Sequence, residues 1–127
     1  MDYMQPWYHG SPLEPTMLLA GSTITQRRDL ARIFSHKPTI VSFEDDGRIK
    51  HNGTAPGYLY LIDEEISPED VEAHPRTTMG PGDEWLTHRE LRLRLLGTVE
   101  PQPEEQFTAE ELEELHRRIA ARRSNVQ

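Results

Sequence analysis

The chain has 127 residues, with 22 Asp and Glu against 14 Lys and Arg, so its net charge is −8 at neutral pH. The length fits one domain, and the lack of cysteine excludes disulfide frameworks, zinc–thiolate sites and thiol nucleophiles. The apolar runs are too short to span a bilayer, no secretory signal is visible, and the acidic balance argues against a nucleic-acid partner, so we expect a cytoplasmic protein without membrane contact.

The N-terminal third is predicted to contain a short strand followed by a helix. Residues 7–9 have the pattern of a strand that ends at the turn formers of residues 10–12. Residues 26–37 carry apolar side chains at three- and four-residue spacing, which predicts a helix with one buried face. Thr23 and Thr25 are the candidate N-caps of this helix.

The middle of the chain is predicted to be a run of strands. Asp45-Asp46-Gly47 has the composition of a hairpin turn, and Ser67–Asp70 combines an N-cap serine with a proline at the first helical position, which predicts a short helix. Because the strands do not alternate with helices, an α+β fold is favoured over a parallel doubly wound sheet. The strands are predicted at residues 39–43, 48–51, 57–63, 84–87 and 91–99.

The C-terminal part is predicted to be a linker and a helix. Residues 100–106 carry two prolines, and Thr108 and Glu111 have the spacing of a capping box at the start of a helix over 107–123. The whole chain, residues 1–127, is therefore predicted to be one domain with a body at 5–100 and this C-terminal helix.

Two segments are candidate sites. In the first, His9 precedes Gly10, so a flat polar ligand could reach the glycine main chain while the imidazole binds a hydroxyl. In the second, Glu84 stands at the start of a strand beside Trp85, where a carboxylate could stabilise developing positive charge. On spacing alone each is better explained as ordinary structure: a half-buried histidine at a turn, and a solvated acid before a core tryptophan.

Neither the acids nor the histidines have the spacing of metal ligands. The acids of residues 63–72 lack the glycine and alternating ligands of a calcium loop, so a solvated acidic surface is favoured. The six histidines are scattered along the chain. We therefore assign no metal site.

Taken together, these segments resemble the ADP-ribosyltransferases of the diphtheria-toxin and poly(ADP-ribose) polymerase type, and most of all the small rifampin ADP-ribosyltransferases. The resemblance covers most of residues 7–123 and implies a small split antiparallel β-sheet core with a few short helices. Its motifs are His9-Gly10-Ser11, Thr23-Ile24-Thr25-Gln26, Tyr58–Asp63, Glu69-Asp70-Val71, Trp85–Arg89 and Leu95–Val99.

The resemblance implies that NAD binds at the first of these motifs. His9 would bond the ribose, and the Gly10 main chain, next to Ser11, would hold the nicotinamide carboxamide. Thr23 falls near the position of the stacking tyrosine of the family, and a threonine cannot stack on nicotinamide. The aromatic ring would then come from another residue, for which the candidates are Tyr58, Phe43 and Trp85.

The resemblance leaves two candidates for the catalytic acid. Glu84 opens a strand, as the catalytic glutamate does in the polymerase-like members, and is the first choice. Asp70 lies nearer the position of the aspartate in the rifampin enzymes and is the second. The pyrophosphate of NAD would need local arginines, for which Arg27, Arg28, Arg76 and Arg89 are candidates.

The expected function is an NAD-dependent ADP-ribosyltransferase that cleaves the nicotinamide N-glycosidic bond, with NAD as substrate and no metal. The acceptor is unknown, and the small size of the chain favours a small-molecule hydroxyl over a protein side chain. Two alternatives remain: a non-catalytic module that binds NAD, ADP-ribose or a protein, and a relative of the RNA 2′-phosphotransferases. The acidic charge counts against an RNA substrate.

Overall fold

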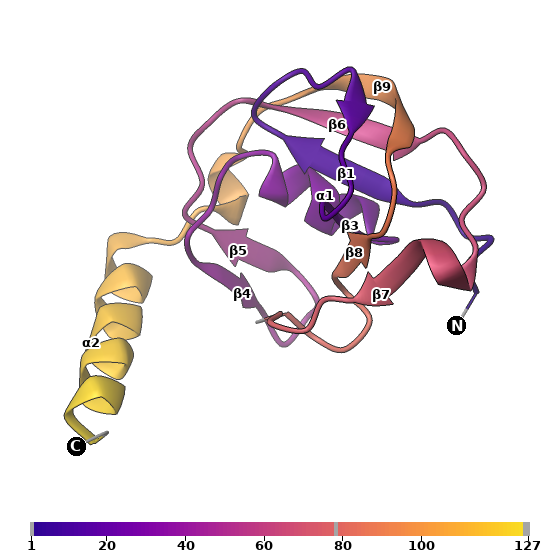
Figure 1. Cartoon of the computed structure of the whole chain (residues 1–127). Coiled ribbons are helices and arrows are strands. Elements are labelled where there is room, and N and C mark those ends of the chain that lie inside the picture. Colours follow the sequence, from indigo (N-terminus) through magenta and orange to yellow (C-terminus); the bar gives the residue numbers. More distant parts are fainter. Residues whose placement is uncertain (1, 78, 126–127) are drawn as a thin grey trace.

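The computed structural model describes residues 2–77 and 79–125 and has an α+β fold of curled antiparallel sheets and two α-helices (Figure 1). All pairings between the named strands are antiparallel. The prediction of an α+β chain with a run of antiparallel strands is therefore confirmed.

The larger sheet has the strand order β1-β6-β9-β2. It contains β1 (Tyr8–Ser11), β2 (Met17–Leu18), β6 (Gly57–Ile62) and β9 (Leu91–Val99). The register places His9 opposite Tyr60, and the pairing of β6 with β9 shifts between Leu59 and Tyr60, where the ladder is irregular. Such a shift increases the local twist of a sheet.

The second sheet has the order β3-β8-β7, with β3 at Thr23–Ile24, β7 at Val71–Ala73 and β8 at Trp85–Thr87. It meets the larger sheet where Tyr8 and Thr25 exchange two backbone hydrogen bonds, of 2.7 and 3.0 Å. The two sheets therefore separate beside His9.

Helix α1 (Arg28–Phe34) lies against β1 and begins two residues later than the sequence predicted. Arg27 occupies the N-cap position, and the Thr25 hydroxyl accepts the Arg27 N–H at 3.0 Å. A methyl group at residue 10 would lie 1.7 Å from the Ala31 carbonyl oxygen. Gly10 is therefore required for the close approach of the helix to the strand.

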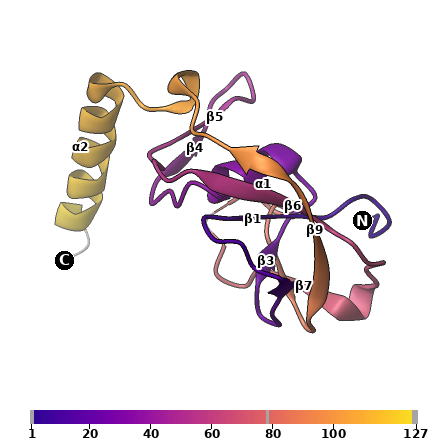
Figure 2. The same ribbon diagram turned by 90° about the horizontal axis from the view of Figure 1, so that it is seen from above.

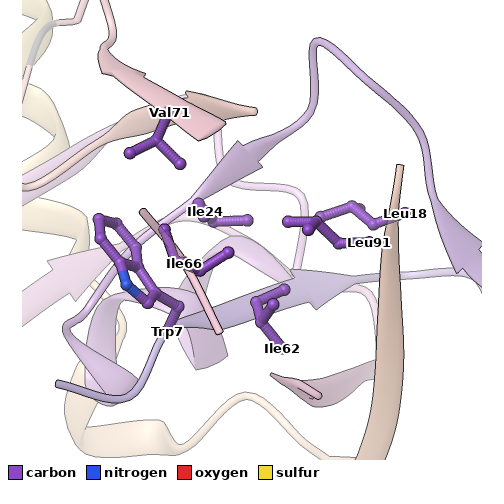
Figure 3. Close-up of a cluster of buried hydrophobic side chains, with 7 residues drawn as sticks. All are labelled: Trp7, Leu18, Ile24, Ile62, Ile66, Val71 and Leu91. Carbon is purple, nitrogen blue, oxygen red and sulfur yellow. The ribbon is translucent and has the colours of Figure 1, made fainter. Parts of the chain in front are cut away.

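Two hydrophobic clusters hold these layers together. The first joins the two sheets and includes Trp7, which is 3% exposed (Figure 3). The second lies under α1 and contains Leu30, Ile33 and Ile49. The members of the first cluster are Trp7, Leu18, Ile24, Ile62, Ile66, Val71 and Leu91.

The remaining elements are short. The predicted hairpin is present as β4 (Val41–Phe43) and β5 (Ile49–His51). The helix predicted at Ser67–Asp70 is a single 3-10 turn, η1 (Pro68–Asp70), because the chain becomes extended at Val71 and pairs with β8 as β7. Strands β2, β3 and β7 were not predicted.

The C-terminal helix, α2 (Ala109–Asn125), follows a 3-10 turn, η2 (Pro103–Glu105). The predicted capping box is present, with the Glu111 N–H bonded to the Thr108 hydroxyl at 3.1 Å and the Thr108 N–H bonded to the Glu111 carboxylate at 3.0 Å. Helix α2 lies at one end of the molecule beside β4 and β5 in both ribbon views (Figures 1 and 2), where Lys50 pairs with Glu111 at 2.7 Å. Neither helix, over its described residues, is long and apolar enough to cross a membrane.

Candidate functional site

A cleft of about 270 Å³ lies where the two sheets separate. Its walls come from β1, β3 and α1. Glu84, the residue just before β8, also lines it. The lining residues are Tyr8, His9, Gly10, Thr23, Ile24, Thr25, Ala31, Phe34 and Glu84. Both segments that the sequence singled out, around His9 and around Glu84, thus reach one cleft.

His9 is held in a defined orientation on one wall of this cleft. Its Nδ1 lies 2.8 Å from the Thr23 carbonyl oxygen, which can only accept, so Nδ1 carries the proton. Burial lowers the pKa of His9 below its usual value, and the bond to Thr23 opposes this only in part. The ring is therefore neutral at pH 7, and Nε2 remains an acceptor with no partner in the described part of the protein.

Glu84 is fixed by one side-chain hydrogen bond. The Thr77 hydroxyl donates to Glu84 Oε1 at 2.8 Å and accepts the Met79 N–H at 3.0 Å. The Glu84 carbonyl oxygen accepts the His74 N–H at 3.0 Å, which ties the strand start to the preceding loop. Oε2 has no hydrogen-bond partner among residues 2–77 and 79–125. Glu84 therefore presents one free carboxylate oxygen.

The aromatic side chains of the cleft are Tyr8 and Phe34. Sequence reasoning missed both as ligand-contacting rings, because Phe34 has the helical spacing of a core residue and Tyr8 that of a strand residue. Of the rings that were considered, Trp85 packs against Trp7 with centroids 5.6 Å apart, and Phe43 lies under the Arg27 guanidinium at 5.2 Å. Tyr58, Phe43 and Trp85 do not line the cleft.

Asp70 lies outside the cleft, in a network of its own. Its carboxylate accepts hydrogen bonds from the Arg89 guanidinium at 2.9 Å and from the Ser67 N–H at 2.9 Å and hydroxyl at 3.0 Å. Arg89 and Ser67 lower the pKa of Asp70 to about 2. These bonds give Asp70 a structural role as the cap of η1.

The other predicted ligand residues divide between the cleft and its surroundings. Gly10 and Thr23 line it, whereas Ser11 and Tyr58, which face each other across β1 and β6, do not. The Ser11 hydroxyl accepts the Leu13 N–H at 3.0 Å. The carboxylate of Glu14 raises the pKa of the Tyr58 hydroxyl.

Arg28 supplies a positive charge at the edge of the cleft. Its guanidinium lies over the Tyr8 ring, 5.9 Å from the centroid, and has no carboxylate within 4 Å in the described parts of the chain. Arg27 is paired with Asp29 at 3.2 Å, and Arg89 is occupied by Asp70. Arg76 is exposed and contacts no ring of the cleft among the described residues, so Arg28 is the best placed of the candidate arginines to meet an anionic group.

No protein-family model, curated protein or solved structure matches this chain. Within residues 2–77 and 79–125, no group of three or more metal-ligating side chains is placed to hold an ion. The groups that the cleft offers to a ligand are a neutral imidazole, a carboxylate, two aromatic rings and a nearby guanidinium.

Proposed function

We propose that the protein is an NAD-dependent ADP-ribosyltransferase whose active site is the cleft between the two sheets. The observation that carries the proposal is that His9 and Glu84 line the same cleft. The antiparallel sheets that separate beside β1, with a helix packed on that strand, also agree with the split sheet core of the ADP-ribosyltransferase fold.

The nicotinamide ribose end of NAD fits the groups of the cleft. A hydroxyl of the ribose donates to His9 Nε2, which is the free acceptor of the neutral ring. Phe34 or Tyr8 supplies an apolar face for the nicotinamide ring, in the role for which Thr23 is unsuited. A volume of about 270 Å³ holds this half of the dinucleotide only, so the ADP half extends outside, where Arg28 can meet the pyrophosphate.

Glu84 is the proposed catalytic carboxylate. As nicotinamide leaves, positive charge moves from the pyridinium ring to the ribose, and a carboxylate held beside the anomeric carbon gains attraction to it. The bond from Thr77 holds Oε1, so Oε2 remains free to face the sugar or to take the proton of the acceptor hydroxyl. Loss of a preorganised group of this kind costs ~3–4 kcal/mol of barrier.

The acceptor is proposed to be the hydroxyl of a small molecule. The cleft of about 270 Å³ opens to solvent, so a small hydroxyl compound can reach a ribose that is bound in it. The nucleophilic hydroxyl attacks the anomeric carbon, nicotinamide departs with the electrons of the broken C–N bond, and the hydroxyl proton passes to Glu84 or to water.

The test is to incubate the protein with NAD and to quantify free nicotinamide by chromatography. Release above the rate without protein, which falls in His9→Ala, supports the proposal. Release is also expected to fall in Glu84→Gln, for which Glu90→Gln is the matched control, because Glu90 is an exposed acid just before β9. Water is the acceptor in this assay when no other hydroxyl is added.

The alternatives predict different results with NAD, either alone or with a 2′-phosphorylated RNA added. Heat stabilisation by NAD without nicotinamide release would identify a binding module, since a ligand that binds the folded state alone raises the melting temperature. If NAD causes no nicotinamide release and no heat stabilisation of the protein, the proposal is overturned. Transfer of an RNA 2′-phosphate to NAD would identify a relative of the 2′-phosphotransferases.

A further inference from the structure

A buried cluster of two histidines, one arginine and one carboxylate joins α1 to the segment that leads into α2. His36 and His51 are both 0% exposed, and their rings stack with centroids 5.6 Å apart. Arg32 of α1 and Glu105 of η2 form a bidentate ion pair. The cluster lies outside the cleft, so its role is independent of the proposed activity.

The hydrogen bonds show where the imidazole protons lie. His36 Nδ1 donates to the Ala55 carbonyl oxygen at 2.8 Å. His51 Nδ1 accepts the Gly53 N–H at 3.0 Å, so the His51 proton is on Nε2, which donates to Glu105 at 3.2 Å. Both rings are therefore neutral. His36 Nε2 is buried without a hydrogen-bond partner in the described residues.

A further proton on His36 disrupts this arrangement. It would occupy Nε2, which is buried and has no acceptor among the described residues. The charged groups that face the pair are Arg32, which repels the proton, and Glu105, which attracts it but is already bound to Arg32. Burial is the largest cause that lowers the pKa of His36; the Ala55 bond opposes it, and His51 and Arg32 lower the pKa further.

The same cluster holds the C-terminal segment on the body. Glu105 binds both Arg32 and His51, and the next residue, Gln106, donates from Nε2 to the Gly53 carbonyl oxygen at 3.1 Å. Gln106 also forms a backbone bridge to His51. Beyond these contacts, the ion pair between Lys50 and Glu111 anchors the first turn of α2.

We propose that the His36–His51–Glu105 cluster is an acid-sensitive latch. At neutral pH it holds residues 103–106, and with them the base of α2, against α1 and β5. In mild acid, the state in which residues 103–106 have separated from the body can bind a proton on His36 that the latched state resists. The latch is therefore complete above the unperturbed histidine pKa of ~6.5 and weakens as the pH falls below it, by up to about tenfold per pH unit.

The test is amide hydrogen exchange of the whole protein by mass spectrometry between pH 7.5 and 5, corrected for the intrinsic pH dependence. We expect residues 100–108 to lose protection by about tenfold per pH unit below ~6.5, while β6 and β9 stay protected. His36→Asn keeps a side-chain N–H for the Ala55 carbonyl but cannot be protonated, so it reduces this acid dependence. His116→Asn, at an exposed position of α2, is the matched control and leaves it unchanged.

Glu105→Gln keeps an acceptor for His51 but removes the charge that Arg32 binds. This variant is the second test of the latch if His36→Asn does not fold. It is expected to lower the protection of residues 100–108 already at pH 7.5. Three results would overturn the proposal: protection of this segment down to pH 5, an unchanged acid dependence in His36→Asn, or opening of β6 and β9 at the same pH as the segment.

Discussion

His9 of β1 and Glu84, just before β8, line one cleft although they belong to different sheets and lie far apart in the sequence. Two local contacts produce this arrangement. Tyr8 and Thr25 join β1 to β3, and Leu86 of β8 pairs with Thr23 of β3. The second sheet thereby brings the start of β8 to the cleft that His9 lines.

Gly10→Ala is expected to destabilise the fold. The added methyl group would lie 1.7 Å from the Ala31 carbonyl oxygen, so α1 must move away from β1. Overpacking of this kind costs ~1–3 kcal/mol, measured as the free energy of unfolding in urea. Gly97→Ala in β9 is the control, because a methyl group there meets no atom within 4 Å. Equal stability of the two variants would contradict the packing of α1 on Gly10.

Thr77→Val is expected to slow nicotinamide release about tenfold, because the Glu84 carboxylate loses the one hydroxyl that orients it. Thr77→Ser retains the hydroxyl and should restore most of the rate. The effect is expected in kcat rather than in KM, since Thr77 acts through Glu84 and does not line the cleft. A rate in Thr77→Val equal to that of the unaltered protein would argue against this positioning role.

The pH dependence of activity should follow His9. Burial lowers the pKa of His9, so the neutral ring that accepts a ribose hydroxyl persists from alkaline pH to somewhat below ~6.5. Activity is therefore expected to fall in acid as the ring gains a proton, and a kcat/KM profile between pH 5 and 8 measures this. The same depression means that His9 contributes stability above the unfolded pKa, which is lost as the pH falls through the folded one. An activity that rises in acid would contradict a neutral His9.

Asp70→Asn is expected to reduce stability by ~1 kcal/mol through the loss of the η1 cap and the Arg89 pair. The Asp70 pKa is about 2 in the folded protein and ~3.9 in an unfolded chain, so its contribution is present above pH ~4 and lost as the pH falls toward 2. Thermal unfolding of the variant at pH 7 measures the loss. Asp63→Asn, at an exposed acid, should leave the melting temperature unchanged.

The sequence predicted the long strands because their patterns extend over several residues. Strands β2 and β3 contain two residues each, which is too few to show a period, and the pairing of β2, β3 and β7 is a property of the folded chain. Ser67 and Pro68 correctly marked a helical start, but the pairing of Val71 with Thr87 limits that helix to one turn.

The candidate site was predicted in part. His9 and Glu84 stood out because their residue types suit charge and hydroxyl binding, and their meeting required the fold. Phe34 carries an apolar helix pattern that is the same whether the ring packs in a core or lines a cleft. The contact of Thr77 with Glu84 depends on the conformation of the loop before β8, for which the sequence contains no periodic pattern.

The rate of nicotinamide release in Glu84→Gln and in Asp70→Asn tests the central claim most directly. Both are compared with the unaltered protein at a temperature at which all three are folded. We expect Glu84→Gln to lose about 10²–10³-fold in rate, and Asp70→Asn to stay within a few-fold of the unaltered protein. A rate that is preserved in Glu84→Gln and lost in Asp70→Asn would contradict the assignment of the active site to the cleft of His9 and Glu84.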